Sequence, residues 1–136
     1  MGLQYEQART ALEAALRRAT EIGSPSSIAV VDAGRELLAF ARQDGALLAS
    51  TEISMGKAYT ACSMRMATKD IGPLTQPGQP LFGLEHTHSR PLVTFGGGRP
   101  LEVGGDVVGA VGVAGGTVDQ DDEIATAAAA ALTSAG

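Results

Sequence analysis

Apolar positions along the first third of the chain change from helical to alternating spacing. Over residues 4–22 they recur along one helical stripe, and Gly23 and Pro25 then end the helix. Two short apolar runs follow, at residues 27–31 and 36–42. The residues between them, Asp-Ala-Gly-Arg, are typical of a tight turn, so the sequence predicts a β-hairpin after the first helix.

The middle of the chain predicts a second helix and then a long irregular segment. Ser50 or Thr51 can cap the helix, which we expect to end near Thr68. Residues 70–85 contain three prolines among glycines and predict a loop. A loop of this length in a compact domain is often functional.

Three strands and a closing helix are predicted in the last third of the chain. Short apolar runs at residues 92–95, 101–103 and 107–113 are separated by glycine turns at 96–98 and 104–106, and an alanine-rich helix over 119–132 follows. Glycines inside the last strand leave room for another backbone or a ligand to approach. Together with the hairpin, this gives an α/β (α+β) fold with five mostly antiparallel strands.

Composition and charge narrow the class of protein. The 136 residues suit one domain spanning 1–136, and 44% hydrophobic content is enough for a core. Net charge is −5 without a block of lysine and arginine, which argues against nucleic-acid binding. No apolar run approaches the ~20 residues of a membrane span, and the N terminus lacks a signal-like apolar segment. With Cys62 alone, no internal disulfide can form, so we expect a cytoplasmic protein.

His86 and His88 are the two histidines of the chain, and they follow the predicted loop. In an extended segment both would project to one side and could share a ligand. Neutral imidazole binds haem iron or another metal, and it also transfers protons near neutral pH. The alternative is two solvated loop histidines. A tetrahedral zinc site is disfavoured, because no closely spaced Cys/His set is present.

Lys57 lies between apolar neighbours in the predicted second helix. In a cleft, burial would lower its pKa and suit it to proton transfer or to holding an anion. Alternatively, its stem covers the flank of the helix. Arg42 and Asp44 close the hairpin and can pair with each other, although an arginine there can also bind a ligand carboxylate.

Four segments carry a pattern shared with a known family: AVVDAG at 29–34, RxDGA at 42–46, SxxKAxTA at 54–61 and GxxVVGAVGV at 104–113. Together they resemble the GlcG/HbpS-like family, also called the haem-degrading domain family, which includes the C-terminal domain of PduO-type proteins. The resemblance implies a profilin-like fold, with a five-stranded antiparallel sheet flanked by helices, and homo-oligomers. Some members bind haem.

Three functions are compatible with these residues. In the first, which the resemblance favours, the protein binds haem or another tetrapyrrole near the second helix and the 70–90 loop. His86 or His88 would then ligate iron, and Lys57, Arg90 or Arg99 would meet the carboxylates. In the second, the protein is a cofactor-free small-molecule enzyme that uses the same histidines and Lys57 for proton transfer. In the third, it is a scaffold subunit without its own chemistry.

Overall fold

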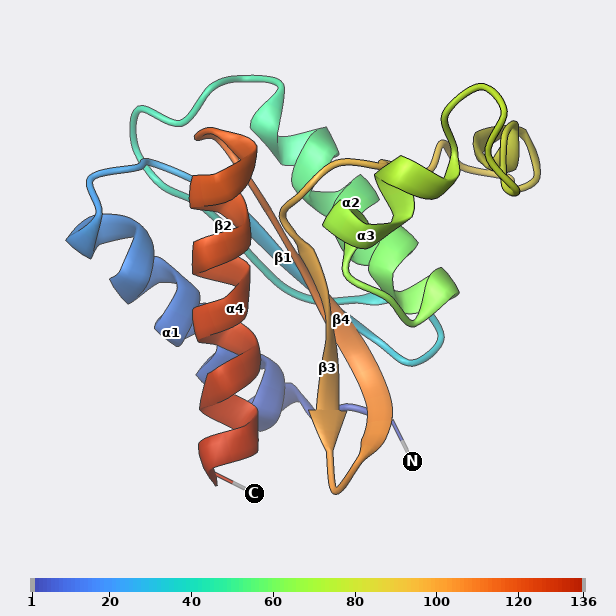
Figure 1. The fold of residues 1–136 in the computed structure, drawn as a ribbon. Helices are drawn as coiled ribbons and strands as arrows, with labels where there is room; N and C mark the ends of the chain where they lie inside the picture. The colour runs from blue at the N-terminus through green and yellow to red at the C-terminus, as the bar shows by residue number, and fades with distance from the viewer. Residues whose placement is uncertain (1, 136) are drawn as a thin grey trace.

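Helices cover both faces of a four-stranded antiparallel sheet in the computed structural model, which describes residues 2–135 (Figure 1). In the order β2-β1-β4-β3, the strands are β1 (Ser27–Asp32), β2 (Leu37–Arg42), β3 (Gly98–Val103) and β4 (Asp106–Ala114). The helices are α1 (Tyr5–Glu21), α2 (Ser50–Met64), α3 (Thr68–Ile71) and α4 (Val118–Ala135). Two 3₁₀ turns, η1 (Gly72–Leu74) and η2 (Leu84–His86), lie between α3 and β3.

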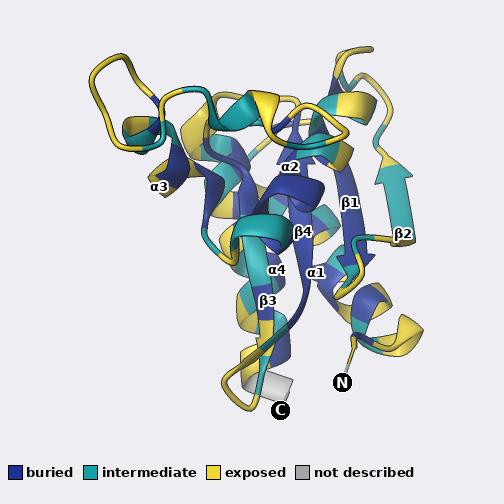
Figure 2. Ribbon diagram, turned by 90° about the vertical axis from the view of Figure 1, so that its right-hand side faces the viewer, coloured by how far each residue is buried: buried dark blue, intermediate teal, exposed yellow. Residues whose placement is uncertain are grey.

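The two central strands are buried on both faces, as the apolar run of β4 predicts. Ile28 and Val30 of β1 face the core shared with α1 and α4, whereas Ala29 and Val31 face α2. Figure 2 shows the resulting contrast between the buried β1 and β4 and the half-exposed edge strand β2. The small residues on the α2 side let that helix approach the sheet closely.

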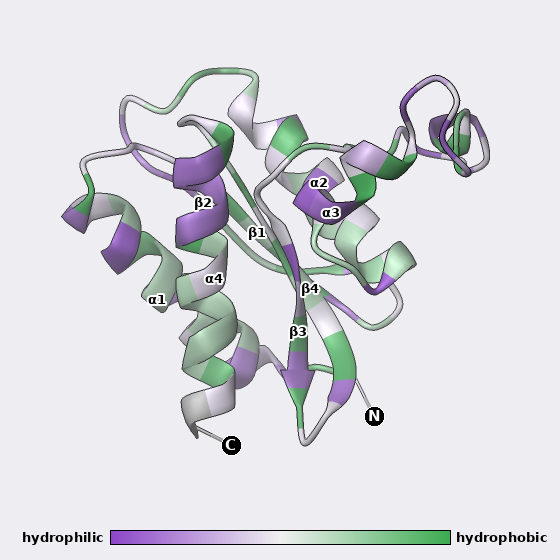
Figure 3. Cartoon of the chain, in the orientation of Figure 1, coloured by the Kyte–Doolittle hydropathy of each residue, from purple (hydrophilic) through white to green (hydrophobic). Residues whose placement is uncertain are grey.

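Helix α4 combines a polar start with an apolar body, which Figure 3 shows as a change from purple to green along the helix. The acidic residues of its first turn lie at the positive end of the helix dipole. Its buried residues, including Ile124 and Ala128, pack into the core beside α1. The predicted closing helix is therefore confirmed, and its first turn lies next to the end of β4.

The predicted hairpin is also confirmed, since β1 and β2 pair in antiparallel register. One oxygen of the Asp32 side chain accepts hydrogen bonds from the backbone N–H groups of Gly34 and Glu36, at 2.8 and 3.0 Å. This is the usual way in which aspartate stabilises a turn. Arg35, next to it, has a left-handed backbone with φ of 69°.

The prediction of five strands is wrong, because residues 92–95 do not join the sheet. The segment lies against α2 instead: Leu92 is buried, and the Val93 N–H donates to Thr60 Oγ1 at 2.8 Å. A short apolar run can bury its side chains on a helix as well as in a sheet, and its sequence alone does not distinguish the two. The glycines at 96–98 are likewise not a simple turn, since Gly98 begins β3 opposite Gly112.

The loop predicted over residues 70–85 contains more structure than expected, and α2 is shorter. Helix α2 ends at Met64, where Arg65 takes a left-handed conformation with φ of 53°. The chain then forms α3 and η1 before the irregular stretch that leads to η2. Thr68, the first residue of α3, accepts the Gly98 N–H at 2.9 Å and so fixes the start of β3.

Candidate functional site

A groove of about 410 Å³ runs between α2 and the segment that follows η2. Its apolar wall comes from Ile53 and Met55 on the helix and from Pro91 and Val93 on the segment. Glu52, Gly56, Tyr59 and Arg90 complete the lining. The hydrogen bond from the Val93 N–H to Thr60 Oγ1 connects this segment to α2. The groove is thus mostly apolar with charged groups at its edge, which is typical of small-molecule sites.

Tyr59 forms the buried base of this groove and is surrounded by basic side chains. The guanidinium carbons of Arg35 and Arg90 each lie 4.8 Å from the centre of its ring. Arg35 Nη1 also donates to the Tyr59 hydroxyl and to Ser63 Oγ, both at 3.2 Å. The His88 ring meets the Tyr59 ring edge-on, with 6.1 Å between centroids. One aromatic ring therefore gathers three basic side chains from two segments, the β1–β2 turn and the stretch after η2.

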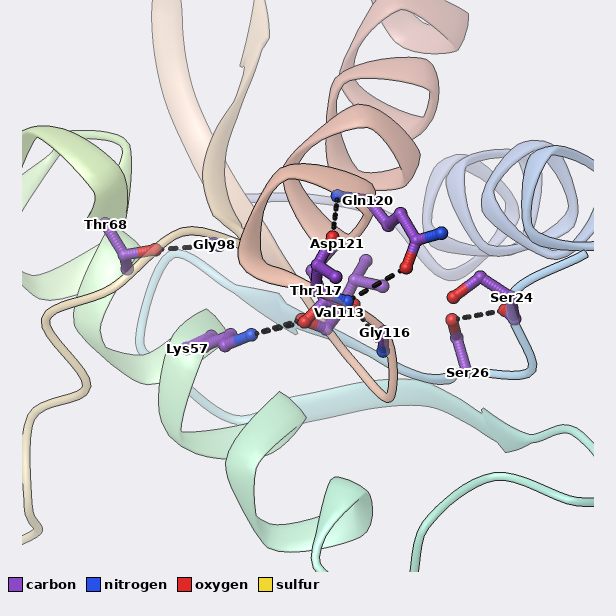
Figure 4. Close-up of polar contacts among 10 residues, drawn as sticks. All are labelled: Ser24, Ser26, Lys57, Thr68, Gly98, Val113, Gly116, Thr117, Gln120 and Asp121. Atoms are coloured by element: carbon purple, nitrogen blue, oxygen red, sulfur yellow. Dashed lines mark hydrogen bonds and ion pairs between the residues drawn. The ribbon is translucent and has the colours of Figure 1, made fainter. Parts of the chain in front are cut away.

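A second polar centre lies where α2 meets the start of α4. Lys57, only 1% exposed, extends from α2 and donates to the Val113 carbonyl at 2.8 Å and to Asp121 Oδ2 at 3.0 Å (Figure 4). The other Asp121 oxygen accepts the Gly116 N–H at 3.0 Å. The Lys57 ammonium also lies 5.1 Å from the centre of the Phe95 ring. Burial lowers the pKa of Lys57, and the charge of Asp121 partly opposes that effect.

This ion pair forms the floor of a smaller cleft of about 120 Å³. Around it stand apolar side chains that are largely exposed, including Leu47, Phe95 and Val118. Two of the three Lys57 N–H groups already have protein acceptors, and the ammonium lies near the Phe95 ring. The pair therefore holds α2, β4 and α4 together, and a catalytic role for Lys57 stays a prediction.

Comparison with known proteins places these features in a family. A family model described as "Haem degrading protein HbpS-like" matches residues 3–130. The chain belongs to the HbpS-like family. An uncharacterized 15.0 kDa protein from Citrobacter freundii, encoded between dhaT and dhaS, is 45% identical over 89% of this chain and 85% of its own length. The family model and this relative thus each cover most of the chain.

Two further relatives of this HbpS-like protein have more specific names. The corrinoid adenosyltransferase PduO of Citrobacter freundii is 39% identical over 97% of the chain, which spans 39% of the length of PduO. A crystal structure described as a PduOC:heme complex is 37% identical, with a TM-score of 0.91, covering 97% of this chain and 96% of the other. The resemblance to the GlcG/HbpS-like family is confirmed.

The two histidines of this HbpS-like protein do not lie in an extended segment. His86 ends the 3₁₀ turn η2 and is exposed, whereas His88 is half-buried beside Tyr59. His88 Nδ1 lies 2.9 Å from Thr87 Oγ1. The reason for expecting both rings on one side therefore does not hold. Iron ligation by His86 or His88 stays a prediction, and His88 is the one beside the groove.

The predicted arginine sites have different surroundings. Arg90 lines the groove. Arg99, on β3, forms a bidentate ion pair with Asp122 of α4, with both N···O distances 2.8 Å, and this pairing raises the pKa of Arg99. Arg42 is exposed at the end of β2, and Asp44 lines a separate hollow near the end of α1. Ligand binding by Arg42, Asp44 or Arg99 stays a prediction.

Three important residues have no distinctive signal in the sequence. Arg35 belongs to a turn, Tyr59 occupies a helical core position, and Asp121 is one of several acids that open α4. Their partners lie 24 or more positions away along the chain, as for Arg35 with Tyr59 and Lys57 with Asp121.

Among residues 2–135, no three Cys, His, Asp or Glu side chains come together as a metal site. Within the same range, no helix has the length and apolar character to cross a bilayer.

Proposed function

We propose that this HbpS-like protein binds haem or a related tetrapyrrole in the groove between α2 and the segment after η2. The observation that carries the proposal is the composition of that groove. The groove has an apolar wall and the guanidinium of Arg90 in its lining. The imidazole of His88 lies beside Tyr59, the buried tyrosine at the base of the groove. A flat ligand with an apolar macrocycle, a metal centre and carboxylates requires this combination of groups.

The family adds support that is independent of the groove. The PduOC relative forms a complex with haem according to its description, and its chain superposes on almost all of this one. The matching family model also bears a haem-related description. In this proposal Ile53, Met55 and Val93 contact the macrocycle, and Arg90 meets a carboxylate. Among the described residues, Tyr59 is the one aromatic residue in the lining, so aliphatic and thioether side chains supply most of the apolar contact.

A haem titration of the purified protein, followed by absorbance, tests the proposal. We expect a saturable shift of the Soret band at about one haem per chain. His88→Ala should change the position of the band, because His88 lies beside the groove. His86→Ala is the matched control and should leave the spectrum unchanged, because His86 is exposed and, among the described residues, it is the ring of His88 that contacts Tyr59. Weak binding without saturation in the unmodified protein would overturn the proposal.

We also infer that the protein assembles with further copies of itself. Leu47 and Leu48, adjacent in the loop before α2, are 65% and 81% exposed, and Phe95 and Val118 are exposed near Leu47 around the smaller cleft. Burying such a surface against a second copy would remove apolar area from water. Light scattering should give a mass above 13.8 kDa. The double variant Leu47→Glu/Leu48→Glu should lower that mass, and a monomeric unmodified protein would contradict the inference.

A further inference from the structure

Two arginines at Tyr59, the base of the groove, lack carboxylate partners among the described residues of a chain that has more acidic than basic residues. Of the ten lysines and arginines, five form ion pairs among the described residues: Arg9, Arg18, Lys57, Lys69 and Arg99. Arg35 and Arg90 are among the other five. No described carboxylate lies within 4.0 Å of either guanidinium, although the chain carries 15 acidic residues. Two unpaired arginines converging on one site indicate a place for an external anion.

The contacts with Tyr59 limit the separation between the guanidiniums of Arg35 and Arg90. Each guanidinium carbon is 4.8 Å from the ring centre of Tyr59, so their separation is no more than twice that distance. Arg35 uses only Nη1 for its two protein hydrogen bonds, to Tyr59 and Ser63. Its remaining N–H groups, and all those of Arg90, have no hydrogen-bond acceptor among the described residues. Each arginine can therefore still bind a carboxylate in bidentate fashion.

The backbone of Arg35 makes glycine a suitable replacement for testing its side chain. Its φ of 69° lies in the left-handed region, which glycine occupies at no steric cost and arginine does not. The turn already contains a glycine, Gly34, at the preceding position, yet arginine occupies the strained one.

We propose that Arg35 and Arg90 each bind one carboxylate of the ligand, so that the groove selects a tetrapyrrole bearing two carboxylates. This inference rests on the proposed function, and it adds a residue, Arg35, that does not line the groove itself. Tyr59 holds the two guanidiniums in place, because both stack on its ring. Arg35 is then a determinant of specificity, since it recognises the second carboxylate.

Haem and its dimethyl ester, in which both carboxylates are neutral, distinguish this inference from haem binding in general. Absorbance titrations in the same co-solvent should give the unmodified protein an affinity for haem at least tenfold higher than for the ester. Arg35→Gly and Arg90→Gln should each lower the affinity for haem about tenfold and leave that for the ester unchanged. Arg35→Gly should lower the melting temperature only slightly, because glycine suits this φ and so offsets the loss of the hydrogen bonds to Tyr59 and Ser63.

Arg65→Gly is the matched control for Arg35→Gly. Arg65 has the same charge, a left-handed backbone with φ of 53° and no ion pair or aromatic contact among the described residues. It should bind haem like the unmodified protein. Equal affinities for haem and the ester, or full haem affinity in Arg35→Gly, would overturn the two-carboxylate inference and leave the proposed function standing. If neither compound binds the unmodified protein, the proposed function fails, and this inference fails with it.

Discussion

Lys57→Met should lower the free energy of unfolding by about 3–5 kcal/mol, the usual cost of removing one partner of a buried ion pair. The substitution keeps most of the side-chain volume but removes the cation paired with Asp121, whose side chain is 4% exposed. It also removes the donor to the Val113 carbonyl. Because a domain of this size is stable by only about 5–15 kcal/mol, urea unfolding curves should separate the two proteins clearly.

The double variant Lys57→Met/Asp121→Leu tests whether the cost comes from the unpaired charge. Removing both partners leaves no isolated buried charge, so the double variant should be more stable than Lys57→Met. Lys69→Met is the control, because Lys69 forms a half-exposed pair with Asp122 at 3.8 Å. Its effect should stay below about 1 kcal/mol. A Lys57→Met protein within that same limit would show that the pair does not hold the three elements together.

The same unfolding measurements at several pH values report on the Lys57 pKa. Burial lowers the pKa of Lys57 in the folded protein below its ordinary value, so the folded state releases this proton at lower pH than the unfolded state. Between the two pKa values the unfolded state binds more protons, and the free energy of unfolding rises with pH. Lys57→Met should lack this rise. The contribution of Lys57 is therefore least favourable below its folded pKa and improves toward the ordinary lysine pKa.

Gly112→Ala should destabilise the protein by about 3 kcal/mol or more, at the upper end of the range for overpacked cores. A Cβ atom at Gly112 would lie 2.0 Å from the Ser54 carbonyl oxygen and 2.5 Å from the Ala58 nitrogen. Both are backbone atoms of α2, so no side chain can rotate away. The helix would have to move off β4, and it carries Lys57 and Tyr59, so the proposed haem binding should weaken too.

Gly2→Ala is the appropriate control for Gly112→Ala. A Cβ there would meet only the Ala33 Cβ, at 3.9 Å, which is an ordinary contact. Its thermal and urea unfolding should match the unmodified protein within about 0.5 kcal/mol. If Gly112→Ala unfolds at the same urea concentration as Gly2→Ala, the close approach of α2 to β4 is not required for stability.

Most of the fold follows from the sequence, because local periodicity reports which face of an element is buried. The stripe of α1, the hairpin turn at Asp32 and the apolar run of β4 each predict the observed element. Lys57 and Arg90 could also be selected as candidates, since a lysine among apolar neighbours and an arginine near a histidine pair are unusual. Their partners could not be predicted, because Asp121 and Arg35 resemble ordinary residues of a helix start and a turn.

The sequence by itself determined the order and type of the main elements, the acidic balance and the membership of the HbpS-like family. Tertiary structure decided what local patterns leave open. It packed residues 92–95 on α2 instead of in the sheet, through the bond from Val93 to Thr60. It also brought Arg35 and Arg90 to Tyr59. The physical reason is that burial and ion pairing depend on which distant segments meet, whereas periodicity reports only the face that each segment buries.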